Sequence, residues 1–178
     1  RWSAWLLLLV PLLGVAAGYV LRLAARQGVP AEAPAEPGEL AAPLAFELTS
    51  LDGAVVRARD YAGRVVLLDV WASWCAPCRL QNEILHPLAS EYGEEVSFLA
   101  VNLGEPEEVV RAHLESEPLP YRVILDPGES LGAQLGIYAL PAVIILDRES
   151  RVSFFRQGLV GESMLRRELA KAAGARPS

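Results

Sequence analysis

The feature that most constrains this chain is its single pair of cysteines, Cys75 and Cys78, which lie between an apolar stretch and an amphipathic one. No other cysteine occurs among the 178 residues. A disulfide across so short a loop removes little entropy from the unfolded chain, so the pair is poorly suited to stabilising a fold. The spacing therefore indicates reactive cysteines at a junction between two secondary-structure elements.

The residues on both sides of the cysteines predict an α/β domain. Residues 65–71 are a continuous apolar run interrupted only by Asp69, as in a central strand that is buried on both faces. Apolar residues then recur at helical spacing, which predicts a helix from about Cys75 to Tyr92 that ends at Gly93. The cysteine pair is thus expected at the N-terminus of a helix that follows a buried strand.

Further elements are predicted before and after this unit. Short apolar segments, 46–48 and 55–56, flank the turn signal Asp52-Gly53 and predict a β-hairpin. The remaining apolar patterns predict strands at 96–101, 122–125, 142–146 and 152–155, and helices at 105–114, 130–135 and 162–173. Together they predict one folded domain over residues 44–178, with a central mixed sheet between helices.

The first part of the chain has a different composition. Residues 2–21 carry no charge, and twenty residues in a helix span about 30 Å, roughly the hydrocarbon thickness of a bilayer. Residues 1–26 are therefore interpreted as a transmembrane anchor. A cleaved signal peptide is the alternative, because Val15-Ala16-Ala17 is an acceptable small-residue cleavage site. Residues 27–43, rich in Pro, Ala and Glu, predict an extended linker.

Charge and composition argue against several classes of partner. The net charge is −6 and there is no run of Lys or Arg, so nucleic acid is not expected to bind. A zinc site needs four ligands, and only His86 and His113 could add to the thiols. His86 would lie about 12 Å along the helix from Cys78, and His113 is interpreted as a solvated surface residue. No metal or cofactor is predicted, although Cu(I) binding by the two thiolates stays open as an alternative function.

The pair is suited to thiol–disulfide exchange, in which one exposed thiolate attacks and a second sulfur resolves the mixed disulfide. Free N–H groups and the positive dipole end at a helix start favour the anion, and cysteines in such settings have a pKa within roughly 3.5–7.5. Cys75 is therefore expected to attack, and Cys78 to resolve by forming the Cys75–Cys78 disulfide. Ala76 and Pro77 tune the reduction potential, so the direction of electron flow stays open.

The segment Trp71-Ala-Ser-Trp-Cys-Ala-Pro-Cys-Arg79 resembles the active site of the thioredoxin superfamily. The resemblance extends through residues 138–147, where the family places a cis-proline before a strand and opposite the cysteines; it identifies that proline as Pro141. It implies a thioredoxin-like fold in which an extended substrate meets the exposed main chain near Leu140. The residues expected to contact substrate are Trp74, Ala76, Pro77, Leu140 and Pro141.

Within the superfamily, the N-terminal anchor, the hairpin and the extra helix and strand between residues 105 and 125 resemble the TlpA/ResA/CcmG-like proteins. This resemblance implies a membrane-anchored thiol:disulfide oxidoreductase with its catalytic domain on the periplasmic or other extracytoplasmic face. It also implies reduction of protein disulfides, in apocytochrome c or a metallochaperone, with a membrane electron donor. An oxidant or isomerase of the same fold is the alternative.

The chain departs from that group at two positions. The group commonly has a Glu three residues after the second cysteine and a Pro two beyond it, whereas this chain has Gln81 and Glu83. Asp69, six residues before Cys75, occupies the place where classical thioredoxins keep a buried acid. A carboxyl group among apolar neighbours has a raised pKa, which suits it to exchange protons with the resolving thiol. Asp69 is therefore predicted to act in place of the missing Glu; the alternative is a hydrogen-bonded, chemically idle Asp.

Overall fold

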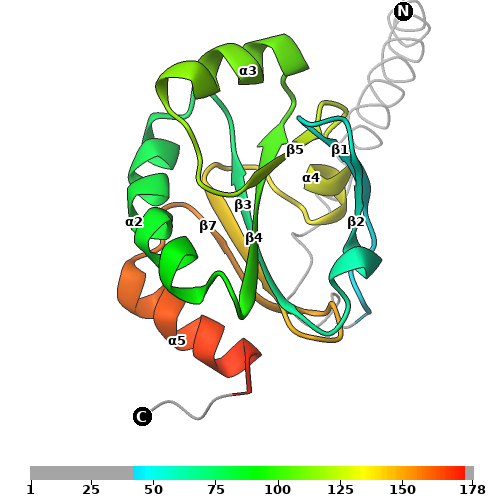
Figure 1. Cartoon of the computed structure of the whole chain (residues 1–178), viewed down its shortest axis with the longest axis vertical. Helices are drawn as coiled ribbons and strands as arrows, with labels where there is room; N and C mark the ends of the chain where they lie inside the picture. The colour runs from blue at the N-terminus through cyan, green and yellow to red at the C-terminus, as the bar shows by residue number, and fades with distance from the viewer. Residues whose placement is uncertain (1–41, 175–178) are drawn as a thin grey trace, which may run out of the picture. The chain divides into compact units, whose positions relative to one another are not determined.

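A seven-stranded mixed sheet organises residues 42–174, the part of the chain that the computed structural model describes (Figure 1). The strands are β1 (Glu47–Ser50), β2 (Val55–Arg57), β3 (Val65–Trp71), β4 (Val96–Leu103), β5 (Arg122–Asp126), β6 (Ala142–Leu146) and β7 (Val152–Gln157). Their order is β2-β1-β5-β4-β3-β6-β7. The β3–β4 and β4–β5 pairs are parallel and the other neighbours antiparallel, so the predicted mixed sheet is confirmed.

Helices cover both faces of this sheet. They are the short 3-10 helix η2 (Ala58–Tyr61), α2 (Ala76–Tyr92), α3 (Glu107–Ser116), α4 (Ser130–Gln134) and α5 (Glu162–Ala172). Figure 1 shows α2 and α5 together on one face, α4 on the other, and α3 at the end of the sheet where β4 finishes, while the β1–β2 hairpin forms one edge of the sheet. The strand β3, which leads into α2, is therefore covered on both sides.

The side chains of β3 alternate between two hydrophobic clusters. Val66, Leu68 and Val70 belong to the cluster that contains residues of α4. Val65 and Leu67 belong to the cluster formed with α2 and α5. Successive strand residues point to opposite faces, so Asp69 and Trp71 lie on the α2 side. The one acid of this strand is thereby placed beneath the helix that carries the cysteines.

The predicted elements are confirmed with small shifts at their ends, and one shift affects the site. β3 and β6 have the predicted bounds, whereas β4 continues to Leu103 and α3 begins at Glu107. Placing Glu105 in a helix was therefore wrong. Pro106 is the N-cap of α3, and Glu105 lies in the loop before it, with its carboxylate turned toward Ser73 and Asn102.

The predicted anchor at residues 1–26, and residues 27–41 of the linker, lie outside the described residues. Within residues 42–174, no helix has both the length and the apolar character needed to cross a membrane.

Candidate active site

Cys75 and Cys78 form a disulfide at the N-terminus of α2. Cys75 is the N-cap, and the N–H of Cys78 donates to its carbonyl oxygen over 3.0 Å, which closes the first turn. Pro77 lies within this turn, where a free N–H would have no partner in the helix. No acidic residue occupies the first turn. The first turn of α2 therefore carries no carboxylate of its own to offset the positive end of the helix dipole, which favours the thiolate of Cys75 once the disulfide is reduced.

The disulfide is more buried than the sequence suggested. Cys75 is 4% exposed and Cys78 is 1% exposed, so the expectation of an exposed first cysteine is wrong for this oxidised form. Both sulfurs pack in an apolar cluster that includes Trp71 and Ala72. The exposed residues around the disulfide are Trp74, at 72%, and the two residues between the cysteines, Ala76 and Pro77.

The loop before β6 lies against the cysteines. Leu140 packs against the cluster that contains both of them, and its peptide bond to Pro141 is cis. Pro141 is buried and its carbonyl oxygen accepts a hydrogen bond from Gly158 over 2.7 Å. Within residues 42–174, the main chain of Leu140 forms no hydrogen bond. Tyr138 in the same loop is 78% exposed, and the sequence had not singled it out.

Asp69 is fully buried on the side of the sheet that α2 covers. The Tyr121 hydroxyl donates a hydrogen bond to its Oδ2 over 3.0 Å, whereas Oδ1 has no partner among the described residues. Burial raises the pKa of Asp69 to about 7, against a smaller lowering by the Tyr121 hydrogen bond. Tyr121 packs against the cluster that holds both cysteines. At neutral pH this carboxyl group is therefore able both to take up and to release a proton.

Gln81, in the position of the group's usual acid, is also fully buried. Its Nε2 donates to the carbonyl oxygen of Val160 over 3.2 Å, and its Oε1 accepts from the Val160 N–H over 2.8 Å. The amide thus ties α2 to the segment between β7 and α5. A carboxamide does not ionise near neutral pH, so this position cannot exchange protons as a Glu would. Glu83 is exposed on the helix surface.

Glu105, which the sequence had not marked as functional, holds the loop that precedes Cys75. Its carboxylate accepts from the Ser73 N–H over 2.7 Å, from the Ser73 hydroxyl over 2.5 Å and from the Asn102 amide over 2.7 Å. Burial alone would raise the pKa of Glu105, but the hydrogen bonds from Ser73 and Asn102 outweigh it and lower the pKa. An ionised carboxylate therefore fixes the turn into the cysteine motif.

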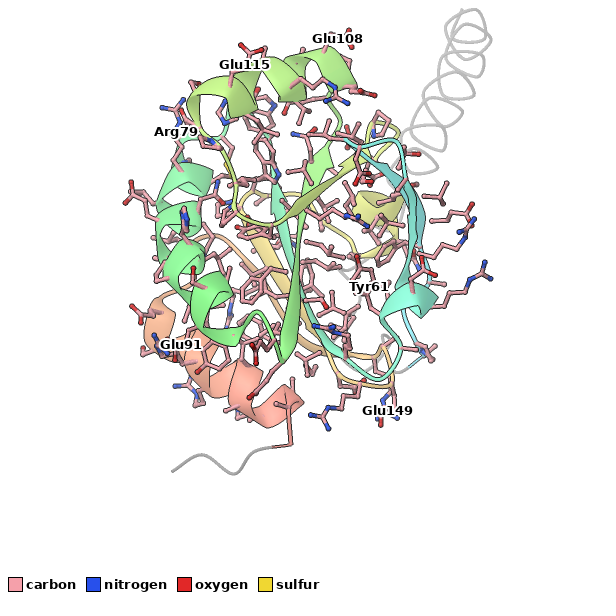
Figure 2. The ribbon with its side chains drawn as sticks, in the orientation of Figure 1. Tyr61, Arg79, Glu91, Glu108, Glu115 and Glu149 are labelled. Carbon is pink, nitrogen blue, oxygen red and sulfur yellow. A yellow bond between two sulfur atoms is a disulfide. The ribbon has the colours of Figure 1, made fainter. Side chains whose placement is uncertain are left out.

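The two histidines differ in their exposure. His86 is exposed on α2. The expectation that His113 is solvated is wrong: its side chain is only 14% exposed, and its ring centroid lies 5.3 Å from that of Trp71. Figure 2 shows Arg79 at the start of α2, just below α3, and its guanidinium lies 3.1 Å from Glu117. In the described part of the chain, no group of three or more His, Cys, Asp or Glu residues is arranged to hold a metal ion.

Comparison with known proteins agrees with this site. The model of the Redoxin family matches residues 36–169. The chain belongs to the Redoxin family. It is 30% identical over 125 residues to the thiol-disulfide oxidoreductase ResA of Geobacillus thermodenitrificans, covering 70% of this chain and 72% of that protein. It is 28% identical over 127 residues to the thioredoxin-like protein YneN of Bacillus subtilis, covering 70% and 74%.

Among solved structures, a candidate thiol:disulfide interchange protein DsbE from Chlorobium tepidum is similar to this Redoxin family member, with a TM-score of 0.69 and 28% identity. The match covers 75% of this chain and 96% of that one. The resemblance predicted from the sequence is therefore confirmed at the level of superfamily and subgroup. The protein is a thiol:disulfide oxidoreductase with a thioredoxin-like fold, and Cys75 and Cys78 form its CxxC pair.

In this oxidoreductase, replacing Glu105 with glutamine is expected to loosen the loop before Cys75. A glutamine has one acceptor oxygen in place of two and presents its amide to donors at Ser73 or Asn102. We expect the Glu105→Gln free energy of unfolding to fall by about 1–3 kcal/mol at pH 7, as measured by urea denaturation. Glu108→Gln, at an exposed position of α3, is the control and should change it by less than about 0.5 kcal/mol. Equal stability of both variants would show that Glu105 does not hold this loop.

Proposed function

We propose that this oxidoreductase is a membrane-tethered, extracytoplasmic reductant of protein disulfides. The observation that carries the proposal is the CxxC pair at the start of α2, together with Leu140, which packs against it and whose main chain forms no hydrogen bond within residues 42–174. In the reduced protein, the Cys75 thiolate attacks a partner disulfide and forms a mixed disulfide. Cys78 then loses its proton to Asp69 and attacks the sulfur of Cys75. The partner leaves as a dithiol with two electrons, and this protein is left with the Cys75–Cys78 disulfide.

The residues around the pair support a protein substrate. Three residues in and beside the CxxC motif are exposed, namely Trp74, Ala76 and Pro77. Leu140, in the loop before β6, packs against the cluster that contains the disulfide. The main chain of Leu140, which has no hydrogen-bond partner among the described residues, offers a donor and an acceptor to an extended segment of the partner, in the manner of strand addition. Pro141 is buried, so in this proposal it shapes the loop and Leu140 makes the contact.

The partner class and the location rest on the resemblance to the TlpA/ResA/CcmG-like group. We propose that the partner disulfide belongs to apocytochrome c or to a metallochaperone, and that a membrane electron donor reduces Cys75 and Cys78 again. Residues 1–26 serve as the anchor and residues 27–43 as the linker to the catalytic domain of residues 44–178. This arrangement places the CxxC pair outside the cytoplasm, where protein disulfides form and persist.

The direction of electron flow is tested with an oxidised peptide that contains the C-x-x-C-H haem-attachment sequence. We expect the reduced protein to convert the peptide disulfide to a dithiol while one equivalent of the Cys75–Cys78 disulfide forms, followed by mass spectrometry after acid quenching. A peptide with serines in place of both cysteines is the control. The reduction potential should lie nearer to about −270 mV, as in thioredoxin, than to about −120 mV, as in a strong oxidant. A potential near the second value would contradict the reductant proposal and favour an oxidant.

A further inference from the structure

One glutamine side chain holds the loop that precedes the cis-proline. Gln157 is the last residue of β7, and the β6–β7 register places it opposite Ala142, which follows Pro141. Its Oε1 accepts hydrogen bonds from the N–H of Tyr138 over 2.9 Å and of Ala139 over 2.8 Å. Its Nε2 donates to the carbonyl oxygen of Gly136 over 3.0 Å. A single carboxamide thus makes three contacts with loop 136–139.

Loop 136–139 belongs to no helix or strand, so regular hydrogen bonding does not fix its backbone. Gly158, the residue that follows β7, donates to the carbonyl oxygen of Pro141 over 2.7 Å. Gln157 and Gly158 therefore hold the chain on both sides of Leu140. The main chain of Leu140 itself is left without a hydrogen bond in the described part of the chain.

We infer that Gln157 is a positioning residue that fixes loop 136–139 for docking of a protein substrate. This inference rests on the proposed function, because a docking loop matters only if the substrate is a protein. A loop that is already ordered lowers the entropic cost of binding, since less freedom is lost when the partner docks. Gln157 thereby holds the exposed ring of Tyr138 and the main chain of Leu140 in place. A small disulfide reaches Cys75 without using this loop.

The test compares a protein disulfide with a small one, using the full chain and its Gln157→Met variant. Methionine keeps the length of the side chain but removes all three hydrogen bonds. With insulin as substrate and dithiothreitol as reductant, we expect KM to rise about fivefold to tenfold while kcat stays within about twofold. The second-order rate constant of the reduced protein with 5,5′-dithiobis(2-nitrobenzoic acid) should also stay within about twofold.

Two further variants serve as controls. Gln157→Glu keeps an oxygen that accepts from the N–H groups of Tyr138 and Ala139, so its KM for insulin should lie between those of the wild type and Gln157→Met. Gln134→Met removes an exposed carboxamide from α4 and should change neither reaction. An unchanged KM in Gln157→Met, or an equal loss with both substrates, would overturn the positioning role.

Hydrogen–deuterium exchange separates this inference from the proposed function. The amides of Tyr138 and Ala139 should exchange about tenfold faster in Gln157→Met than in the wild type, because their acceptor is gone. Wild-type protein that reacts with the small disulfide but not with insulin would contradict the proposed function, and the exchange rates would still report on the loop. Equal exchange rates in the two proteins would overturn the inference by themselves.

Discussion

Replacing Cys75 with serine is expected to abolish thiol:disulfide exchange, with a loss of more than about a thousandfold in the rate of insulin reduction. A serine hydroxyl is not ionised at neutral pH and forms no disulfide, so the first attack on the partner cannot occur. Cys75 is the N-cap of α2 and has no side-chain capping hydrogen bond to lose. The substitution therefore removes the nucleophile, and the circular dichroism spectrum should remain that of the wild type.

Cys78→Ser is the matched variant and should behave differently. Cys75 still attacks, but no second sulfur is present to release the partner, so a mixed disulfide accumulates and is visible on a non-reducing gel. The position of Cys78 inside the first turn, at 1% exposure, keeps it away from the partner and beside Cys75. If Cys75→Ser accumulated the mixed disulfide and Cys78→Ser did not, the assignment of attacking and resolving cysteines would be reversed.

The parts of the molecule that the sequence predicted well are those with a local signal. The apolar run of β3 and the helical spacing of α2 depend on neighbours in the chain, so both elements lie where the pattern placed them. The CxxC motif is equally local. Asp69 could be predicted as a site residue because it is the one acid in a strand whose apolar run indicates burial on both faces. Its burial and its raised pKa agree with that expectation.

The residues that the sequence did not reveal act through distant contacts. Glu105 binds Ser73 across 32 residues, Tyr121 binds Asp69 across 52, and Gln157 binds the N–H of Ala139 across 18. Each looks like an ordinary polar or aromatic residue near the end of an element, and no periodicity shows which group will face it. The burial of Cys75 was missed for the same reason, since it depends on how the loop before β6 packs.

Asp69→Asn is expected to slow exchange at pH 7 on the order of tenfold to a hundredfold, because the resolving thiol loses its proton acceptor. Burial raises the pKa of Asp69 to about 7, so the wild-type rate should show an inflection near that pH. Asparagine has nearly the same shape but does not titrate, so the inflection should disappear. Stopped-flow measurement of the single-turnover reaction with insulin between pH 5 and 9 checks this result.

The same substitution has a second readout in stability. The unfolded chain loses the Asp69 proton near its ordinary pKa of 3.8, whereas the folded chain keeps it to about 7. Between these values the unfolded state binds fewer protons, so this group lowers the free energy of unfolding as pH rises, and the effect levels off above pH 7. Relative to the wild type, Asp69→Asn should therefore gain about 3 kcal/mol between pH 4 and pH 7 in urea denaturation.

The Tyr121→Phe variant tests whether Asp69 accepts a proton during exchange or is only a buried, chemically idle residue. The Tyr121 hydroxyl donates to Oδ2 of Asp69 and lowers its pKa, opposing the effect of burial. Without the hydroxyl the pKa rises further, so the inflection of the exchange rate should move to higher pH instead of disappearing. A pH profile that is the same in the wild type, Asp69→Asn and Tyr121→Phe would show that Asp69 is chemically idle. An inflection that disappears in one variant and moves in the other would identify Asp69 as the group that takes the proton of Cys78.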